Sequence, residues 1–339
     1  MEPKRMLIWE QNWLGDVLFS TPFIKAIRKK FKDAYIAVII DPSCKEILEG
    51  NSQIDDLILY DEKNKHRGII GRIKLIVQLK KKSFDTAFLL HRSLSRAIIT
   101  EIAGIQRRIG YFYKKRNFIL TDIVDLPEIP LHRIEYFLDI ARYLGCDISD
   151  KNLEFFISES DRSYINEILR QNSIKEKDPF VVINPGANWE PKRWPEENFA
   201  ELSDRLSNIY NVKIIISGAE KDIAKALRIQ GKAFNKLIIL CGKTTLKQLG
   251  ALFEKAKLVI SGDSGPLHIA LAVRSRAGVI ALFGPTSPEL TGPYASGNYR
   301  IIQKDVGCEV PCYDVACSDN RCMKAISVRD VMEKVRAFI

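Results

Sequence analysis

The sequence predicts an α/β protein made of two halves, each a parallel β-sheet covered by helices. Short apolar runs alternate with amphipathic segments of helical period, and this alternation is typical of parallel sheets. The alternation occurs twice, once on each side of a polar joint near residue 172. With 339 residues the chain is long enough for two domains, and each half can bury a core without disulfides or metals.

Strands and helices are expected in turn along both halves. In the first half, strands are expected at 6–10, 35–40, 57–60 and 85–90, with helices at 16–31, 69–82 and 133–144. In the second half, strands are expected at 180–184, 213–217, 237–241, 258–261 and 279–283, with helices at 196–209, 221–234 and 246–255.

The joint between the halves is a helix over 161–171 followed by a charged segment that ends at Pro179. We therefore expect domains at 1–172 and 173–322 and a separate final segment at 323–339. In that segment Ser327 precedes Asp330 by three residues, a capping-box pattern that predicts the start of a helix.

Composition excludes several classes of protein. With 46% hydrophobic and 28% charged residues, the chain is not a disordered tail. Its apolar runs fall far short of the roughly 20 residues that cross a bilayer, and the N-terminus lacks the pattern of a secretory signal. Three isolated cysteines, Cys44, Cys146 and Cys241, are expected to be buried thiols in a reducing cytoplasm.

Positive charge is concentrated in one block. The net charge is +10, and between Lys63 and Arg116 fifteen Lys and Arg residues stand against only Asp85 and Glu101. A block of one sign indicates an anionic partner: a nucleic acid, an anionic membrane face or a phosphorylated substrate. For any single residue, a solvated helix face of a basic protein is the alternative.

The first motif, residues 12–22, follows the first expected strand and opens the first helix. Gly15 is expected to let the backbone turn at the sheet edge where α/β proteins bind ligands. Asp16 then lies at the helix start, either as an N-cap or as a carboxylate that acts as a general base.

The second motif, residues 184–195, joins a Pro-Gly turn and two Trp residues to the adjacent Lys192 and Arg193. Such a loop can hold an anion against the edge of the sheet. A basic surface loop is the alternative reading.

The third motif, residues 259–268, is a strand that runs into a Gly-rich turn and a helix. The backbone N–H groups of Ser264 and Gly265 are expected to point outward at the helix N-terminus, where they can bind phosphate. His268 lies one turn inside that helix, as a ligand or catalytic group or as a core histidine.

The fourth motif, residues 281–288, is another strand and turn that either faces the same ligand or simply ends the strand. A fifth feature is a run of four thiols, Cys308, Cys312, Cys317 and Cys322. Their spacing lacks the tight C-x2-C pairs of structural zinc sites, so reduced thiols in a surface loop are favoured over a metal site.

Some motifs are absent from the sequence. There is no D-x-D, the acidic pair that holds Mg²⁺ or Mn²⁺ for a nucleotide-sugar. There is also no G-x-x-x-x-G-K-[ST], which argues against a P-loop NTPase, and no G-x-G-x-x-G in the first helix, which weakens a dinucleotide dehydrogenase.

Taken together, the first four motifs resemble those of the ADP-heptose:lipopolysaccharide heptosyltransferases, glycosyltransferase family 9. The likeness extends from Leu7 to about Phe338. The segments that carry it are Leu14-Gly15-Asp16-Val17, Asn184-Pro185-Gly186-Ala187, Lys192-Arg193-Trp194-Pro195, Asp263-Ser264-Gly265-Pro266-Leu267-His268 and Phe283-Gly284-Pro285-Thr286. One departure is residues 271–278, which replace a shorter family turn, so the helix end and the next strand are expected to shift.

The resemblance implies a GT-B architecture: two Rossmann-like domains with parallel sheets facing a central cleft. It implies that the N-terminal domain binds the acceptor, that the C-terminal domain binds the nucleotide-sugar, and that the helix at 323–339 packs back on the N-terminal domain.

The resemblance also implies roles for individual residues. Asp16 corresponds to the catalytic base, Lys192 to the contact with the donor phosphates, and Asp263, Ser264 and Gly265 to the turn around the nucleotide. An acid after Gly218, either Glu220 or Asp222, is expected at the ribose. The other expected donor-binding residues are Asn184, Gly186, Ala187, Arg193, Gly242, His268 and Gly284, and the expected acceptor-binding residues are Asn12, Gly15, Arg92, Arg96 and Arg133.

The implied reaction is inverting, metal-independent transfer of heptose from ADP-heptose to the inner core of lipopolysaccharide. Inversion needs one in-line displacement, so a single base suffices, and Asp16 fits that count. A segment over 103–111 and the motif at Asp16 favour heptosyltransferase II over heptosyltransferases I and III or another family 9 enzyme. A sugar-nucleotide epimerase or hydrolase, and a basic anion-binding module, are the more distant alternatives.

The implied partners are ADP-heptose, an acceptor that is Kdo₂-lipid A or its heptosylated form, and an anionic membrane surface. No cofactor and no nucleic acid are expected. The implied location is cytoplasmic, peripheral on the inner face of the inner membrane. Residues of the basic block and its surroundings are expected to grip acceptor anions or line the cleft: Arg92, Arg96, Arg107, Arg108, Lys114, Lys115, Arg116, His132 and Arg133.

Overall fold

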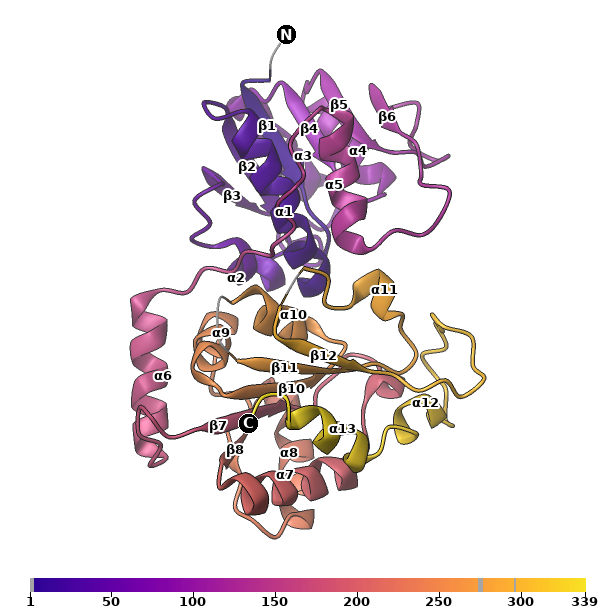
Figure 1. Ribbon diagram of the computed structural model, residues 1–339. Helices are drawn as coiled ribbons and strands as arrows, with labels where there is room; N and C mark the ends of the chain where they lie inside the picture. Colours follow the sequence, from indigo (N-terminus) through magenta and orange to yellow (C-terminus); the bar gives the residue numbers. More distant parts are fainter. Residues whose placement is uncertain (1–2, 274–276, 296) are drawn as a thin grey trace. The chain divides into compact units, whose positions relative to one another are not determined.

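The computed structural model describes residues 3–273, 277–295 and 297–339. The chain divides into two compact units, Met1–Phe156 and Ile157–Ile339, and each has its own parallel sheet with helices on both faces (Figure 1). The predicted α/β class with two parallel sheets is confirmed. Among the described residues, no helix combines the length and apolar character needed to cross a membrane.

The first unit is built around a six-stranded sheet of order β3-β2-β1-β4-β5-β6. Its strands are β1 (Arg5–Trp9), β2 (Tyr35–Ile40), β3 (Asp56–Leu59), β4 (Thr86–Leu89), β5 (Arg107–Tyr111) and β6 (Asp122–Val124). Its helices are α1 (Leu14–Lys30), η1 (Pro42–Cys44), α2 (Lys45–Leu48), α3 (Gly68–Lys82), α4 (Leu94–Ile102) and α5 (Arg133–Tyr143).

The sheet of the second unit has the order β12-β11-β10-β7-β8-β9. Taken from its β9 edge, this is the same order of strands as in the first unit. Its strands are β7 (Phe180–Asn184), β8 (Lys213–Ile216), β9 (Ile238–Ile239), β10 (Leu258–Gly262), β11 (Gly278–Leu282) and β12 (Tyr299–Ile302). Its helices are α6 (Glu159–Gln171), η2 (Glu190–Lys192), α7 (Glu196–Tyr210), η3 (Glu220–Asp222), α8 (Ile223–Lys232), α9 (Leu246–Lys255), α10 (Gly265–Ala272), α11 (Pro288–Thr291), α12 (Arg321–Lys324) and α13 (Val328–Val335).

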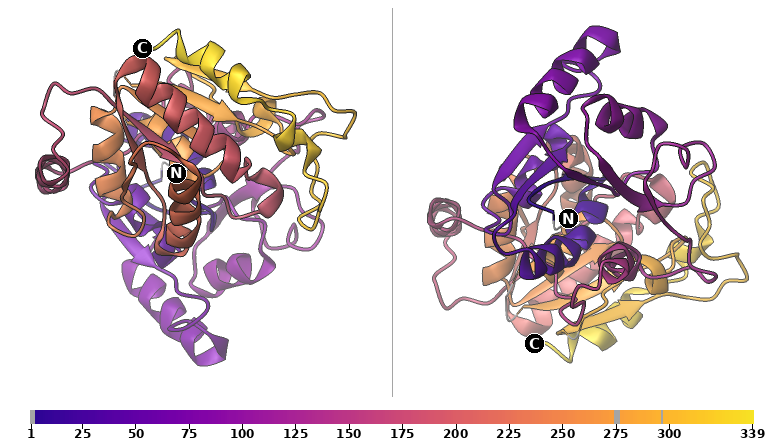
Figure 2. Two further views of the ribbon diagram at one scale, coloured as in Figure 1. Left: turned by 90° about the horizontal axis from the view of Figure 1, so that it is seen from below. Right: turned by 90° about the horizontal axis from the view of Figure 1, so that it is seen from above.

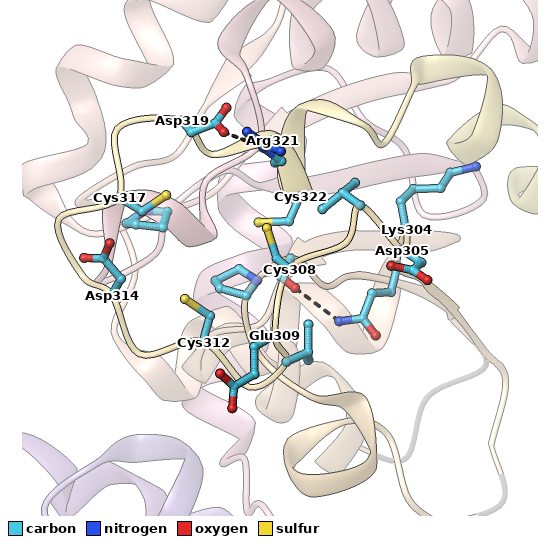
Figure 3. A pocket seen from close by; sticks show the side chains of 16 residues that line it. Lys304, Asp305, Cys308, Glu309, Cys312, Asp314, Cys317, Asp319, Arg321 and Cys322 are labelled. Atoms are coloured by element: carbon cyan, nitrogen blue, oxygen red, sulfur yellow. Dashed lines mark hydrogen bonds and ion pairs between the residues drawn. The ribbon is translucent and has the colours of Figure 1, made fainter.

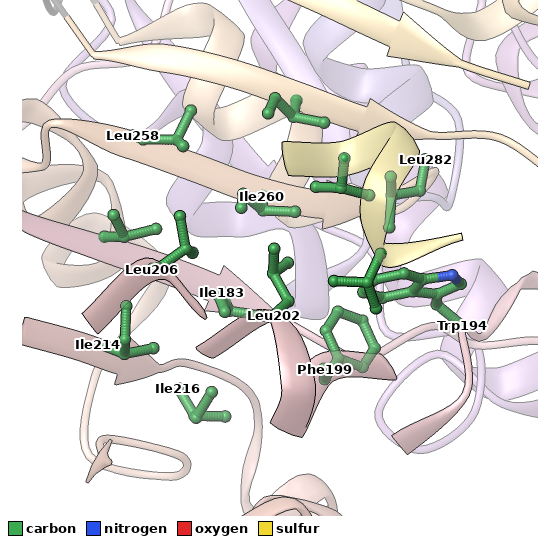
Figure 4. Close-up of a cluster of buried hydrophobic side chains, with 14 of the residues drawn as sticks. Ile183, Trp194, Phe199, Leu202, Leu206, Ile214, Ile216, Leu258, Ile260 and Leu282 are labelled. Atoms are coloured by element: carbon green, nitrogen blue, oxygen red, sulfur yellow. The ribbon is translucent and has the colours of Figure 1, made fainter. Parts of the chain in front are cut away.

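The central strands are buried on both faces, which explains why they appear in the sequence as continuous apolar runs. In the second unit, Ile183 and Ile260 of neighbouring strands pack against Phe199 and Leu202 of α7 (Figure 4). In the first unit, Leu7 and Trp9 of β1 pack with Leu75 of α3. Each unit therefore buries a separate apolar core.

The boundary expected at residue 172 is wrong, because the helix before it belongs to the second unit. The division lies between Phe156 and Ile157. In α6, Arg162 forms an ion pair with Glu254 of α9, with an Nε–Oε2 distance of 2.8 Å. The Tyr164 hydroxyl of α6 donates to the Lys243 carbonyl. The polar sequence of this helix could not reveal that it packs on the C-terminal half of the chain.

The expected placement of the C-terminal helix on the first domain is also wrong. Val328, Val331 and Val335 of α13 lie in the apolar core of the second unit. The indole N–H of Trp194 donates to the Ile326 carbonyl, 2.8 Å away. The capping box of Ser327 and Asp330 is present, as the sequence predicted.

The departure expected at 271–278 is only partly visible, because residues 274–276 lie outside the described residues. Strand β11 begins at Gly278, one residue earlier than predicted, and pairs with β10 along its whole length. The third motif, residues 259–268, therefore begins on a strand that is regularly paired.

Candidate active site

Both sheets place the motif residues at the same topological position. Strand order reverses between β1 and β4 in the first unit and between β7 and β10 in the second. Ligands of such sheets bind beyond the carboxyl ends of the strands at this switch point. Asp16 follows β1 and Arg92 follows β4, while Lys192 follows β7 and Asp263 follows β10. The sequence motifs thus lie at the two positions where the topology favours ligands.

Asp16 lies in the first turn of α1 and forms an ion pair with Arg133, with an Oδ1–Nε distance of 2.9 Å. The Asp16 side chain keeps 21% of its surface exposed, so the carboxylate can still be approached. The Arg133 guanidinium also stacks over Tyr136, and Arg92 donates to the hydroxyl of the same tyrosine. The structure therefore brings Asp16, Arg92 and Arg133 into one polar cluster around Tyr136.

Asn12 and Arg96 form a different contact from the one expected. Arg96 is only 3% exposed, and it donates to the Glu10 carbonyl and to the Asn12 side-chain oxygen, 2.9 and 2.8 Å away. Gly15 lies inside α1 rather than at the turn, which residues 11–13 form. We assign Arg96 and Asn12 to holding the loop before Asp16, not to gripping an acceptor anion.

Glu10 lies beside Asp16, although none of the sequence motifs includes it. It is fully buried beyond β1, accepts a hydrogen bond from the Ser20 hydroxyl of α1 at 2.7 Å, and lies near Asp16. Burial raises its pKa to about 8. The available signal was a charged residue directly after an apolar strand, where a buried acid is out of place.

Several residues of the basic block bind other groups of the protein and so stabilise the fold. Arg116 is fully buried and donates to the carbonyls of His91 and Tyr111. Arg107 pairs with Asp122, and Arg108 donates to the Ile119 carbonyl. His132 is a buried N-cap of α5. Besides Arg92, only Lys114 and Lys115 of the residues expected to grip anions are well exposed, so that expectation is corrected for the others.

In the second unit, Lys192 is held by Asp263. The Lys192 ammonium lies 2.7 Å from one Asp263 oxygen, which also accepts from the Thr286 hydroxyl at 2.7 Å. His268 Nε2 lies 3.5 Å from the other oxygen. Although burial opposes ionisation, the hydrogen bond from His268 and the charge of Lys192 hold the pKa of Asp263 well below its usual range. The third and fourth motifs and Lys192 thus meet at one carboxylate.

This geometry changes the role expected for Asp263. Its carboxylate is almost fully buried and faces three protein groups, and a carboxylate repels a diphosphate. The Asp263 carboxylate therefore holds Lys192 in place. Pro266 has no N–H, so the amides at the start of α10 that can meet an anion are those of Ser264 and Gly265.

The loop after β7 is fixed by its own residues. Asn184 is buried and its amide donates to Ser217. The Arg193 guanidinium donates to the Ala187 carbonyl from two nitrogens and pairs with Glu190. Arg193 therefore closes the loop around Ala187, and Lys192 is the cation at the site.

Of the two acids expected at the ribose, only Glu220 is exposed. Asp222 is buried and accepts from the Ala219 amide. A Cβ on Gly186 would lie 3.0 Å from the Asp222 carboxylate, so a larger residue there would push against this carboxylate. Glu220 is exposed beyond β8, beside Gly242, whose φ of +72° favours glycine.

Gly284 and the four clustered cysteines line one cavity, which also includes Pro191 of the loop after β7. A Cβ on Gly284 would lie 2.5 Å from the Met323 sulfur, so this glycine admits α12 rather than a ligand. The four thiols line a cavity of about 440 Å³ that reaches Pro191 (Figure 3). Within the described ranges, no three Cys, His, Asp or Glu side chains are arranged to hold a metal ion. Cys44, Cys146 and Cys241 are buried, as predicted.

Comparison with known proteins gives a consistent result. A family model described as glycosyltransferase family 9 (heptosyltransferase) matches residues 72–321. The chain is 27% identical to lipopolysaccharide heptosyltransferase 2 of Escherichia coli K12 over 352 aligned positions, covering 99% of this chain and 98% of that protein.

Two solved structures share the fold. A family 9 glycosyltransferase of Veillonella parvula superposes with a TM-score of 0.91 at 24% identity, covering 99% of this chain and 97% of that chain. ADP-heptose LPS heptosyltransferase II of Escherichia coli superposes with a TM-score of 0.80 at 25% identity, covering 98% of each chain. The α/β fold of GT-B type that the sequence analysis expected is thereby confirmed.

Proposed function

Because the chain belongs to glycosyltransferase family 9, the heptosyltransferase family, we propose that it transfers heptose from ADP-heptose to a sugar hydroxyl of the lipopolysaccharide inner core. The observation that carries the proposal is the Lys192–Asp263 pair beside the N-terminus of α10. A fixed ammonium group next to outward amides is suited to a diphosphate leaving group.

On the donor side, the bond between the sugar carbon and the diphosphate oxygen breaks, and negative charge develops on ADP. Lys192 and the amides of Ser264 and Gly265 stabilise that charge. Lys192 is in place before the reaction, because Asp263 pairs with it and the Thr286 hydroxyl donates to the same Asp263 oxygen. Loss of one such donor typically costs about 3–4 kcal/mol of transition-state stabilisation. We propose that this charge replaces the need for a divalent cation.

On the acceptor side, Asp16 takes the proton of the attacking acceptor hydroxyl. At the same time, the oxygen of that hydroxyl bonds to the sugar carbon from the face opposite ADP. A single displacement of this kind inverts the configuration and needs one base. Arg133 holds the Asp16 carboxylate in position at 2.9 Å. Arg92, on the same tyrosine as Arg133, is available to an anionic group of the acceptor.

For the acceptor itself, we propose heptosyltransferase II activity, which adds to an already heptosylated core. The likeness of the Asp16 motif and of residues 103–111 to that branch supports it, as do the names of the relatives compared above. Heptosyltransferases I and III differ in acceptor, so the acceptor distinguishes them. We also propose that the protein works at the inner face of the inner membrane, where such an acceptor is anchored.

The direct test is incubation of the protein with ADP-heptose and EDTA, together with either Kdo₂-lipid A or its mono-heptosylated form, followed by mass spectrometry of the acceptor. We expect the heptosylated form to gain one heptose in the presence of EDTA. Transfer to Kdo₂-lipid A alone would replace the proposed branch by heptosyltransferase I. Transfer to neither acceptor would contradict the proposed function.

A further inference from the structure

Helix α3 of the first unit carries an apolar stripe on its outer surface. Ile69 and Ile70 are 77% and 73% exposed, and Ile73 and Val77 are about half exposed. These residues recur at the three- and four-residue spacing of one helix face. We propose that this stripe and the cations beside it dock the protein on an anionic lipid bilayer.

The stripe is not the core side of the helix. Leu75 and Leu79 point inward and are at most 1% exposed, packed in the core with Trp9 of β1. The helix therefore has two apolar faces, of which one is satisfied by the sheet. An exposed apolar patch of this kind marks a binding surface more often than a scattered single side chain does. Figure 2 shows α3 at the outer edge of the first unit.

Cations surround the stripe and acids are missing from the helix. Helix α3 and its N-cap Arg67 together contain six Lys and Arg residues and no Asp or Glu. The exposed cations are Lys63, Lys65, Arg67, Lys74, Lys80 and Lys81. Two others are already paired, Arg72 with Glu62 and Lys82 with Asp56. The exposed cations are therefore available to bind anions around the stripe.

The loop before the helix is fixed so that its cations remain next to the stripe. A Cβ on Gly71 would lie 2.6 Å from the backbone of His66, so the loop and the first turn of α3 are in close contact. His66 is buried and its ring accepts from the Asp61 amide. Lys65 and Arg67 flank this anchored histidine. The surface is thus built from one continuous segment, residues 61–81, whose loop packs on the first turn of α3.

This combination matches the surface of a bilayer better than that of a protein. Helices that lie in the membrane interface carry bulky apolar residues on one face and Lys or Arg beside them. Anionic lipid supplies a continuous field of negative charge, worth about fivefold in binding for each cation. The helix has 15 residues, about 22 Å, and lies flat rather than crossing the membrane. The choice of lipid also rests on the proposed function, whose acceptor is lipid-anchored.

The test is co-sedimentation of the full chain with vesicles of phosphatidylglycerol mixed with phosphatidylcholine, compared with vesicles of phosphatidylcholine alone. We expect binding to the anionic vesicles that weakens as salt is raised. The double variant Ile69→Ser/Ile73→Ser should bind at least about tenfold more weakly. Lys74→Gln/Lys81→Gln should also bind more weakly. The matched controls are Ile209→Ser/Leu227→Ser and Lys255→Gln/Lys257→Gln on the second unit, where the replaced side chains are also exposed. Both control variants should bind like the wild type.

Vesicle binding needs no substrate, so its outcome is independent of the transferase assay. If the docking surface is right, the Ile69→Ser/Ile73→Ser variant loses vesicle binding but keeps wild-type transfer to a lipid-free acceptor saccharide. Wild-type protein that ignores anionic vesicles, or serine variants that bind them normally, would overturn the proposal. So would sedimentation showing a dimer of the wild type that these variants dissociate, because the stripe would then cover a second copy of the chain.

Discussion

Asp16 and Asp263 are both carboxylates that follow a central strand, yet their surroundings suit different proposed roles. Asp16 keeps a fifth of its side chain exposed and pairs with Arg133. Asp263 is buried against Lys192, Thr286 and His268. The sequence predicted both as site residues, because motif spacing identifies position. It could not separate a reacting carboxylate from a positioning one, since that difference lies in contacts between distant loops.

Replacing Asp263 with Asn should lower the rate of transfer by about tenfold to 100-fold, because Lys192 loses the charge that orients it. The effect should fall mainly on kcat, with KM for the acceptor unchanged. Steady-state kinetics checks this split. Asp204→Asn is the control, since Asp204 is also buried and binds backbone amides of Phe234 and Asn235. Equal loss in both variants would point to general destabilisation instead.

Glu10 should make the stability of the first unit depend on pH. Its folded pKa of about 8 lies above the ordinary value of 4.5, so the folded state holds a proton that the unfolded state releases between these values. Stability contributed by that proton is complete below about pH 4.5 and is lost as pH rises toward 8. The slope is at most about 1.4 kcal/mol per pH unit.

Glu10→Gln removes this proton and should flatten the pH dependence. Thermal unfolding should be measured between about pH 5 and pH 8. We expect the variant to become more stable relative to the wild type as pH rises. Glu176→Gln, an exposed acid, should leave the wild-type slope in place. Parallel curves for wild type and Glu10→Gln would show that Glu10 is ionised in the folded protein.

At the scale of elements, the sequence predicted the buried central strands well and the peripheral ones poorly. Strands β2 and β7 were predicted residue for residue, because continuous apolar runs have no other reading at that length. Strands β5 and β12 were missed, since Arg107, Arg108 and Arg300 interrupt the apolar pattern. The end of the chain was predicted as a helix, but its packing partner depended on contacts with β11 that no local pattern encodes.

That packing gives a prediction for Gly278, the first residue of β11. A Cβ there would lie 2.3 Å from the ring of Phe338, which follows α13. Gly278→Ala should destabilise the protein by about 1–3 kcal/mol through overpacking. Denaturant unfolding should show that Phe338→Ala relieves part of this cost in the double variant. Gly231→Ala in α8, where nothing lies within 4 Å, should instead be neutral or stabilising. Additive effects of Gly278→Ala and Phe338→Ala would contradict the contact.

At the scale of the whole molecule, the chain repeats one topology in two units with separate cores. Lys192, Asp263, Thr286 and the start of α10 all belong to the second unit. We therefore predict that residues 157–339 alone fold cooperatively and bind ADP as tightly as the full chain, but transfer no sugar. Calorimetry with ADP measures this. An unfolded fragment, or one that folds without binding ADP, would show that the nucleotide site needs the first unit.

The proposed mechanism requires one carboxylate of the first unit to serve a reaction whose leaving group is held by the second. The decisive measurement is single-turnover transfer by Asp16→Asn, with ADP affinity measured on the same preparation. We expect transfer to fall by at least about two to three orders of magnitude while ADP affinity stays at the wild-type value. Transfer at the wild-type rate would remove Asp16 as the base, and a parallel loss of ADP affinity would mean that Asp16 supports the nucleotide site instead.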